Sequence, residues 1–283
     1  MLAFARWVMR GLPQACGAAL LASLIPWLFW VGAAVSALVT LRRGFSAAVP
    51  VLIAAAIPAG WWWMQGDTVP LAAVLMVTLM ATVLRARVSW GQALIAAALA
   101  TTVLIQLGIF LPKDTSQLLM QIRDSSPELD EMLANYAQQG VAVDRLTELV
   151  ISAVTGLVVL FASIICLALA RSWQAGLYNP GGFRSEFHQL RLSRGELAVV
   201  VAFGIIGVVL GLPSAALVAW VPLLVAGIAL VHGFIGMKGM NGLWLVGFYV
   251  LLLTTWPTIV IVLLLALADT FANFRIRITS SQR

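Results

Sequence analysis

Charged residues are scarce in this chain of 283 residues. Asp, Glu, Lys and Arg together make up 10% of the sequence, whereas apolar residues make up 62%. A soluble domain is usually about 25% charged and about 45–50% apolar. Because so few charges cannot give a folded domain a surface that water solvates, the composition excludes an ordinary soluble globular protein. It predicts an integral membrane protein.

Cysteine and recognisable catalytic motifs are also scarce. The two cysteines, Cys16 and Cys166, lie within apolar runs and predict neither a disulfide framework nor a metal site. The sequence contains no GxSxG, HExxH or GxxxxGK[ST] motif and no paired-cysteine spacing. We therefore predict no catalytic residue, no metal ligand and no cofactor, and we expect a protein that is not an enzyme. An ATP-driven function would need another subunit.

The basic residues lie in short connections between apolar runs, and the net charge is +6. No basic stripe exceeds a few residues, which argues against nucleic acid as a partner. The positive-inside rule instead places the basic clusters on the cytoplasmic side of a membrane. These clusters lie at residues 42–43, 85–87, 171–194, 238 and 275–277. The tip at residues 65–68 and the segment 112–146 are then expected outside.

The apolar runs predict an all-α fold: a polytopic membrane helix bundle with about eight membrane segments, forming one domain over residues 1–283. The runs cover residues 12–41, 44–64, 69–84, 90–111, 147–170, 197–212, 215–237 and 243–269. The first contains Pro26 and the last contains Pro257, and both are bounded by basic residues at each end. Either each of these runs is a pair of short segments, or one terminus breaks the positive-inside rule.

Small residues recur within the runs and predict close helix packing. The recurring glycines are Gly204, Gly207 and Gly211 in one run, and Gly233, Gly236 and Gly239 around the end of the next.

Residues 112–146 form the main excursion outside the apolar runs, and acidic residues outnumber basic ones there. Ser126, Pro127 and Glu128 predict a helix start, and Gly140 predicts its end. One interpretation is an amphipathic helix that lies on the membrane surface or caps the bundle. The other is a lid over an outward-facing cavity.

Residues 172–196 form a basic loop on the predicted cytoplasmic side. Its charged residues lie within eleven positions and are Arg184, Glu186, His188, Arg191 and Arg194. One interpretation is contact with the head groups of membrane lipids. The other is docking of an unidentified membrane or cytoplasmic protein partner.

Four polar residues near or within the apolar runs are candidates for substrate binding. They are Gln106, His232, Asn241 and Asp269. An ionisable residue at membrane depth indicates a functional site by default. In the functional interpretation, Asp269 faces a cavity or pairs with an arginine of the central loop. The alternatives are a packing histidine at 232, a polar helix end at Asp269, and hydrogen bonds between helices at the two amides.

Four stretches resemble the YybS-like family of predicted bacterial membrane proteins, whose function is unknown. They are GGFRSEFHQLRL, LVHGFIGMKG, LWLVGFYVLLL and LLLALADTFANFRIR. The resemblance implies a multi-pass protein of the bacterial inner membrane and carries no activity. At the level of fold, the family is distantly similar to the membrane substrate-binding subunits of vitamin importers. Ala33 and Ala37 could then mimic the small-residue contact of such subunits with a coupling protein.

Two hypotheses on function follow. In the first, the protein binds or transports a small molecule or lipid in an outward-facing cavity reached by Gln106. In the second, it is a membrane scaffold or assembly protein that recruits a partner through residues 181–194. An enzyme acting on a lipid is a third hypothesis, and its acid–base groups would be His188, Glu186, His232 and Asp269.

Overall fold

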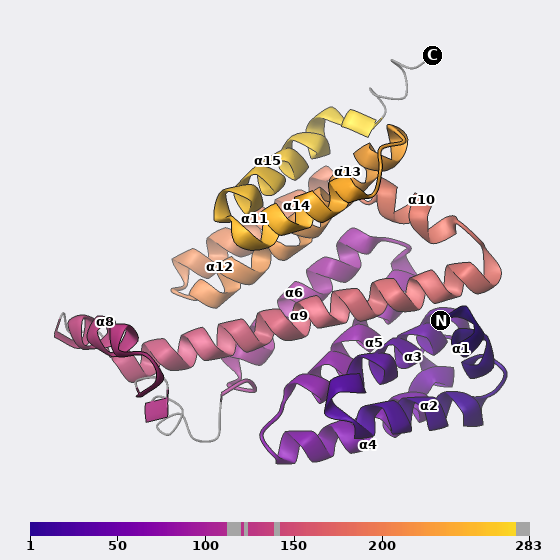
Figure 1. The fold of residues 1–283 in the computed structure, drawn as a ribbon, viewed down its shortest axis with the longest axis horizontal. Helices are drawn as coiled ribbons and strands as arrows, with labels where there is room; N and C mark the ends of the chain where they lie inside the picture. The colour runs from indigo at the N-terminus through magenta and orange to yellow at the C-terminus, as the bar shows by residue number, and fades with distance from the viewer. Residues whose placement is uncertain (112–119, 122–123, 139–141, 276–283) are drawn as a thin grey trace.

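The computed structural model describes residues 1–111, 120–121, 124–138 and 142–275 (Figure 1). Helices make up 86% of the structure, and the described residues contain no strand. The prediction of an all-α fold is confirmed. The long apolar helices are compatible with a multi-pass membrane protein, because a helix satisfies its own backbone groups in hydrocarbon.

The longest helix, α9 (Val143–Tyr178), runs through the middle of the molecule between two groups of helices (Figure 1). The first group contains α1 (Leu2–Val8), α2 (Leu12–Leu24), α3 (Phe29–Arg43), α4 (Phe45–Met64) and α5 (Val69–Arg87). The second contains α10 (Gly182–Gln189), α11 (Arg194–Val209), α12 (Pro213–Ala219), α13 (Val221–Met237), α14 (Leu243–Thr254) and α15 (Trp256–Ala272). Helix α6 (Trp90–Gln106) contacts members of both groups.

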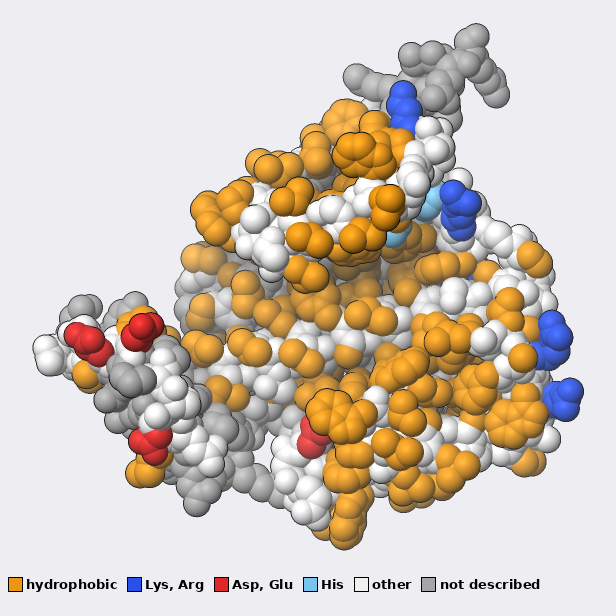
Figure 2. Space-filling model, viewed as in Figure 1, with side chains coloured by type: hydrophobic (Ala, Val, Ile, Leu, Met, Phe, Trp, Pro, Cys, Tyr) orange, Lys and Arg blue, Asp and Glu red, His pale blue; other side chains and the backbone are white. Residues whose placement is uncertain are grey.

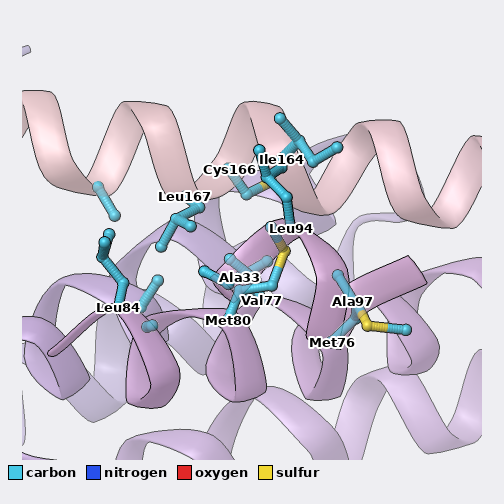
Figure 3. Close-up of a cluster of buried hydrophobic side chains, with 14 of the residues drawn as sticks. Ala33, Met76, Val77, Met80, Leu84, Leu94, Ala97, Ile164, Cys166 and Leu167 are labelled. Atoms are coloured by element: carbon cyan, nitrogen blue, oxygen red, sulfur yellow. The ribbon is translucent and has the colours of Figure 1, made fainter. Parts of the chain in front are cut away.

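The core lies where α3, α5, α6 and α9 meet. Figure 3 shows Met76 and Met80 of α5 beside Leu94 of α6 and Leu167 of α9. Ala33 and Ala37 of α3 are fully buried, because small side chains let α3 approach its neighbours closely. They therefore do not present the external contact that the family resemblance implies for a coupling protein.

Both terminal apolar runs are divided, so the first of the two alternatives is observed. Helices α2 and α3 form a hairpin around a 3₁₀ turn, Pro26–Leu28. The Arg43 guanidinium donates to the Met9 carbonyl at 3.0 Å, while the Trp62 indole donates to the Ser23 carbonyl near the turn at 3.3 Å. Helices α14 and α15 meet at an angle of 114° beside Pro257. Each run therefore begins and ends at the same end of the molecule.

Among the described residues, four helical segments are long and apolar enough to cross a membrane, and up to six if each bent pair is one span. The four cover Phe45–Met64, Val69–Arg87, Arg145–Tyr178 and Pro213–Met237, and the bent pairs are α10 with α11 and α14 with α15. The prediction of about eight segments is not confirmed. The prolines divide the terminal runs into shorter helices, and α2 and α6 are themselves shorter than a full span.

On the face shown in Figure 2, the Lys and Arg side chains lie at one end of the molecule and the Asp and Glu side chains lie at the other. We define the basic end by Arg43, Arg85, Arg171, Arg191, Lys238 and Arg275, which lie where α3, α5, α9, α10, α13 and α15 meet. The opposite end carries Asp67 in the turn between α4 and α5, and the acidic residues around α8 (Pro127–Gln138). Basic residues far apart in the sequence thus gather at one end of the fold, and the side of the membrane that this end faces stays a prediction.

Helix α8 begins at Pro127, as the capping pattern predicts, and packs beside the start of α9. Gly140 and much of the segment 112–126 lie outside the described residues, as do the α8 side chains of Leu129, Leu133 and Tyr136. The amphipathic surface helix and the lid therefore both stay predictions.

The α2–α3 hairpin predicts which segments share a side of the membrane. In a chain with Cys16→Ala and Cys166→Ala, a single Trp27→Cys should react with a membrane-impermeant maleimide from the same side as Gln65→Cys. Ser185→Cys on α10 should react only from the other side, because it lies at the basic end. Labelling in sealed vesicles of both orientations measures this. Reaction of Trp27→Cys from the side of Ser185→Cys would contradict the hairpin.

Candidate functional site at the basic end

The central loop, residues 179–193, closes the basic end and ends in a helix cap. Ser193 is the N-cap of α11, and its hydroxyl accepts the Glu196 N–H at 3.2 Å while the Glu196 carboxylate accepts the Ser193 N–H at 2.8 Å. The same carboxylate accepts a hydrogen bond from the Ser89 hydroxyl at 2.7 Å. Since Ser89 is the N-cap of α6, the starts of α6 and α11 are fastened together.

Glu186 fastens α10 to the central helix. Its carboxylate pairs with the Arg171 guanidinium of α9 through Nε at 2.9 Å and Nη2 at 2.6 Å, and it accepts the Trp90 indole N–H at 2.5 Å. Both members of the ion pair are about three-quarters buried. Charge-assisted bonds in such surroundings are stronger than surface ones. Glu186 is therefore part of the fold and is not available to a docking partner.

The network continues into the first group of helices. The Arg171 guanidinium donates to the Gln174 side-chain carbonyl at 2.8 Å, and the Gln174 amide donates to the Leu41 carbonyl at 3.3 Å. The Arg85 guanidinium donates to the same Leu41 carbonyl at 2.6 Å. Leu41 lies in the last turn of α3, where the carbonyl oxygens of a helix have no partners within the helix. Basic clusters far apart in the sequence thus join in one structure.

Asp269 is almost fully buried and forms an ion pair with Arg275, which follows α15. Asp269 Oδ2 lies 2.6 Å from Arg275 Nη1, and Oδ1 accepts the Phe274 N–H at 2.8 Å. Asn273 adopts the left-handed conformation that ends α15 and turns the chain back toward Asp269. Arg275 Nη2 then donates to the Leu190 carbonyl of the central loop at 2.9 Å. The predicted arginine partner exists, but it comes from the tail and not from the loop.

A pocket of about 580 Å³ opens between α10, the following extended segment, α13 and the chain after α15. Its lining residues are Ser185, His188, Gln189, Arg191, Gly233, Met237, Asn273 and Arg275. We call it the basic-end pocket. Its volume falls within the range of about 300–1,000 Å³ that is usual for ligand sites.

Two glycines of α13 let α10 lie close enough to form this pocket. A Cβ atom at Gly233 would lie 2.9 Å from the His188 carbonyl oxygen, and one at Gly236 would lie 2.5 Å from the His188 ring. The prediction of close helix packing is confirmed at these positions, and also at Gly207, where a Cβ would lie 2.8 Å from the Ala216 nitrogen. Gly239 instead has a positive φ just after α13 ends.

The charge of the basic-end pocket is positive. Arg191 and Arg275 line it together with His188, and none of its described lining residues is acidic. Burial lowers the pKa of His188, and the charges of Arg184 and Arg275 lower it further. Guanidinium, hydroxyl and amide groups there are donors for a phosphate or a carboxylate. The arrangement suits an anion, which would also favour the protonated form of His188.

His232 and Asn241 lie outside this pocket lining. The His232 Nε2 is 2.8 Å from the Tyr249 hydroxyl of α14, and its ring packs edge-on against Phe187 of α10. The Asn241 side-chain oxygen accepts the Leu243 N–H at 3.0 Å, a local bond two residues along the chain. His232 therefore joins α13 to α14 and α10, whereas Asn241 bonds only within its own turn.

Gln106 lies at the opposite end, where its amide donates to the Ser214 hydroxyl at 3.1 Å and ties α6 to α12. The hollow beside it measures about 160 Å³ and is also lined by Arg145, Glu148 and Ser152. The four residues predicted to bind substrate are thus not brought together. Asp269 alone contributes to the basic-end pocket, from behind Arg275.

Arg275 was expected only as part of a cytoplasmic basic cluster and not as a site residue. The available signal was Asp269, six positions earlier, with an asparagine between them that can turn the chain. Ser185, Gln189 and Asn273 carried no signal in the sequence. No group of three or more potential metal ligands occurs among the described side chains.

Comparison of the chain with protein-family models, with curated proteins and with solved structures finds no match. The function is therefore inferred from the geometry and chemistry of the basic end.

The contacts of the Glu186 carboxylate predict that its removal lowers the stability of the protein. Glu186→Ala should lower the free energy of unfolding by about 1–3 kcal/mol, because it leaves the Arg171 guanidinium and the Trp90 indole without an acceptor. Thermal unfolding in detergent measures the change. Arg184→Ala, at an exposed position on the same helix, is the control and should unfold like the wild type. Combining Glu186→Ala with Arg171→Met should recover part of the loss; a purely additive loss would contradict the pairing.

Proposed function

We propose that the protein is a non-enzymatic, multi-pass protein of the bacterial inner membrane that binds an anionic small molecule or lipid head group in the basic-end pocket. The observation that carries the proposal is the convergence of Arg191, Arg275 and His188 on one pocket of about 580 Å³ with no acidic lining residue among those described. The YybS-like resemblance supports the bacterial membrane, and the positive-inside rule makes the basic end cytoplasmic.

The basic-end pocket is preferred to an outward-facing cavity for two reasons. The hollow beside Gln106 measures about 160 Å³, below the usual size of a ligand site. Its lining also contains both Arg145 and Glu148, so its charges balance, whereas the charges of the basic-end pocket do not. The ligand is thus expected to enter from the side on which the basic residues lie.

A scaffold is the second candidate function, and the exposed arginines of the loop favour it. Arg184, Arg191 and Arg194 are all exposed, and the guanidinium of Arg194 lies 5.8 Å from the ring centre of Phe271. Because Glu186 and Glu196 fix the loop at both ends, these arginines form a surface of defined shape. Such a surface would suit an acidic partner.

Native mass spectrometry of protein extracted gently from its membrane tests the two candidates. The wild type should retain an anionic ligand of a few hundred daltons that is released on unfolding. Arg191→Ala should lose it, because it removes a cation from the pocket, whereas Arg184→Ala should retain it. Equal retention by wild type and Arg191→Ala would contradict the proposed site. A stoichiometric protein, lost in Arg184→Ala with Arg194→Ala, would instead support the scaffold.

The position of His188 in the basic-end pocket predicts that anion binding depends on pH. Its pKa is lowered, so the ring is neutral in the empty pocket at pH 7. A bound anion raises that pKa, and binding therefore takes up a proton. Affinity for sulfate, which does not titrate in this range, should rise as the pH falls from 7 toward 5. Isothermal titration at several pH values measures this rise.

His188→Gln is the matched control, because glutamine keeps a hydrogen-bond donor but does not titrate. It should bind sulfate with an affinity that changes little between pH 7 and 5. The empty wild type should show the opposite sign in stability. Since the unfolded chain binds the proton more readily, the free energy of unfolding should fall as the pH falls below 6.5 and level off below the lowered pKa. If the affinity for sulfate still depends on pH in His188→Gln, His188 is not the source of that dependence.

A further inference from the structure

A second hollow, of about 700 Å³, lies on the surface between α5, α6 and α11. Its lining residues are Thr82, Val83, Ala86, Arg87, Gln92, Ile95, Ala96, Leu99, Ser193, Gly195, Glu196 and Val199. We call it the α6 groove. It shares no lining residue with the basic-end pocket.

One face of α6 forms the floor of the groove. Gln92, Ile95, Ala96 and Leu99 follow one another at the spacing of a single helical stripe. Apolar side chains occupy the part toward the middle of the molecule, and Leu99 and Val199 are both about half exposed there. The Thr82 hydroxyl donates to the Thr78 carbonyl at 2.8 Å, so it leaves no unsatisfied polar group in this part. The inner part of the groove therefore suits a hydrocarbon chain.

The other part of the groove, at the basic end, is polar and carries charges of both signs. The hydrogen bond from Ser89 to Glu196 holds the walls together there, and Gly91 lets them approach, because a Cβ atom at 91 would lie 2.6 Å from the Glu196 carboxyl carbon. Arg87 is exposed and forms no ion pair with Glu196 or with any other described acidic residue. An exposed cation and a carboxylate thus line the same end of the groove without neutralising each other.

We infer that the α6 groove binds a membrane phospholipid with an ethanolamine-type head group. One acyl chain lies along Ile95, Ala96 and Leu99, the phosphate contacts the Arg87 guanidinium, and the ammonium group donates to the Glu196 carboxylate. The occupant is a lipid because the surrounding solvent at this depth is lipid. The head group is zwitterionic because the groove offers one charge of each sign. A quaternary ammonium cannot donate a hydrogen bond to Glu196. A purely anionic head group brings no cation to that carboxylate, whose described partners are the uncharged Ser89 hydroxyl and Ser193 N–H.

Photo-crosslinking of the full-length protein in vesicles tests this inference. The probe is phosphatidylethanolamine with a diazirine on one acyl chain, and the crosslinked residues are mapped by peptide mass spectrometry. Crosslinks should concentrate on residues 95–99 and 199. Unlabelled phosphatidylethanolamine should displace them at a concentration at least threefold lower than phosphatidylglycerol or phosphatidylcholine requires. Crosslinks to the exposed Leu253 of α14 report bulk lipid and should not saturate.

Matched variants locate the site. Ala96→Phe fills the floor of the groove and should reduce the specific crosslinks at least fivefold, whereas Ala198→Phe, at an exposed position of α11 outside the lining, should not. Arg87→Gln should weaken competition by phosphatidylethanolamine, and Glu196→Gln should abolish its advantage over phosphatidylglycerol. The competition between unlabelled lipids for the wild-type protein tests the inference even if a variant does not fold.

Three results would overturn the inference. Crosslinks that spread evenly over the lipid-facing helices and do not saturate would show that the groove holds only bulk lipid. Equal competition by phosphatidylglycerol would show that the ammonium group is not recognised. Equal losses in Ala96→Phe and Ala198→Phe would place the lipid elsewhere. None of these results bears on the anion site, because Arg191, Arg275 and His188 lie outside the groove.

Discussion

The ion pair between Glu186 and Arg171 fixes the position of α10, and the basic-end pocket depends on that position. Arg171 belongs to α9, which contacts both groups of helices. The ion pair therefore attaches the loop to the central helix of the fold. With α10 held there, His188 lies against Gly233 and Gly236 of α13 and forms one wall of the pocket. Loss of the pair would free α10 without breaking any membrane helix. Stability and binding are therefore expected to fall together.

At the same end of the molecule, the ion pair between Asp269 and Arg275 compensates the burial of a carboxylate. A carboxylate that is almost fully buried is costly unless a cation and hydrogen bonds compensate it. Arg275 and the Phe274 N–H provide both, and the turn at Asn273 brings them into place. The second guanidinium nitrogen then reaches the Leu190 carbonyl of the loop. The C-terminal helix and the central loop are thus joined through one side chain, which also lines the pocket.

The helices and their ends were predictable because they depend on local sequence. Apolar length and the capping pattern at residues 126–128 act within a few residues, and the structure confirms the helix start at Pro127. The number of spans was not predictable, because a proline such as Pro257 either kinks a helix or divides it according to what packs around it. Pairings such as Glu186 with Arg171 and Trp90 join distant positions, so nothing in the local pattern of either partner reveals them. For the same reason, polarity within a run identified Gln106 and Asn241 but did not reveal their partners, Ser214 and the Leu243 N–H.

The arginines of the basic end serve two purposes that their contacts distinguish. All of them can orient the chain in a membrane, since that effect depends on charge near the span ends alone. Arg43, Arg85, Arg171 and Arg275 also donate to backbone carbonyls or carboxylates and so hold helices together. Arg191 lines the pocket and Arg87 lines the groove, and neither forms an ion pair with a described acidic residue. To orient the chain in a membrane, Arg191 and Arg87 would not need to line a hollow. The placement of these two cations, one beside other cations and one beside a carboxylate, is the observation that supports an anion as the proposed ligand of the first hollow and a zwitterionic lipid as that of the second.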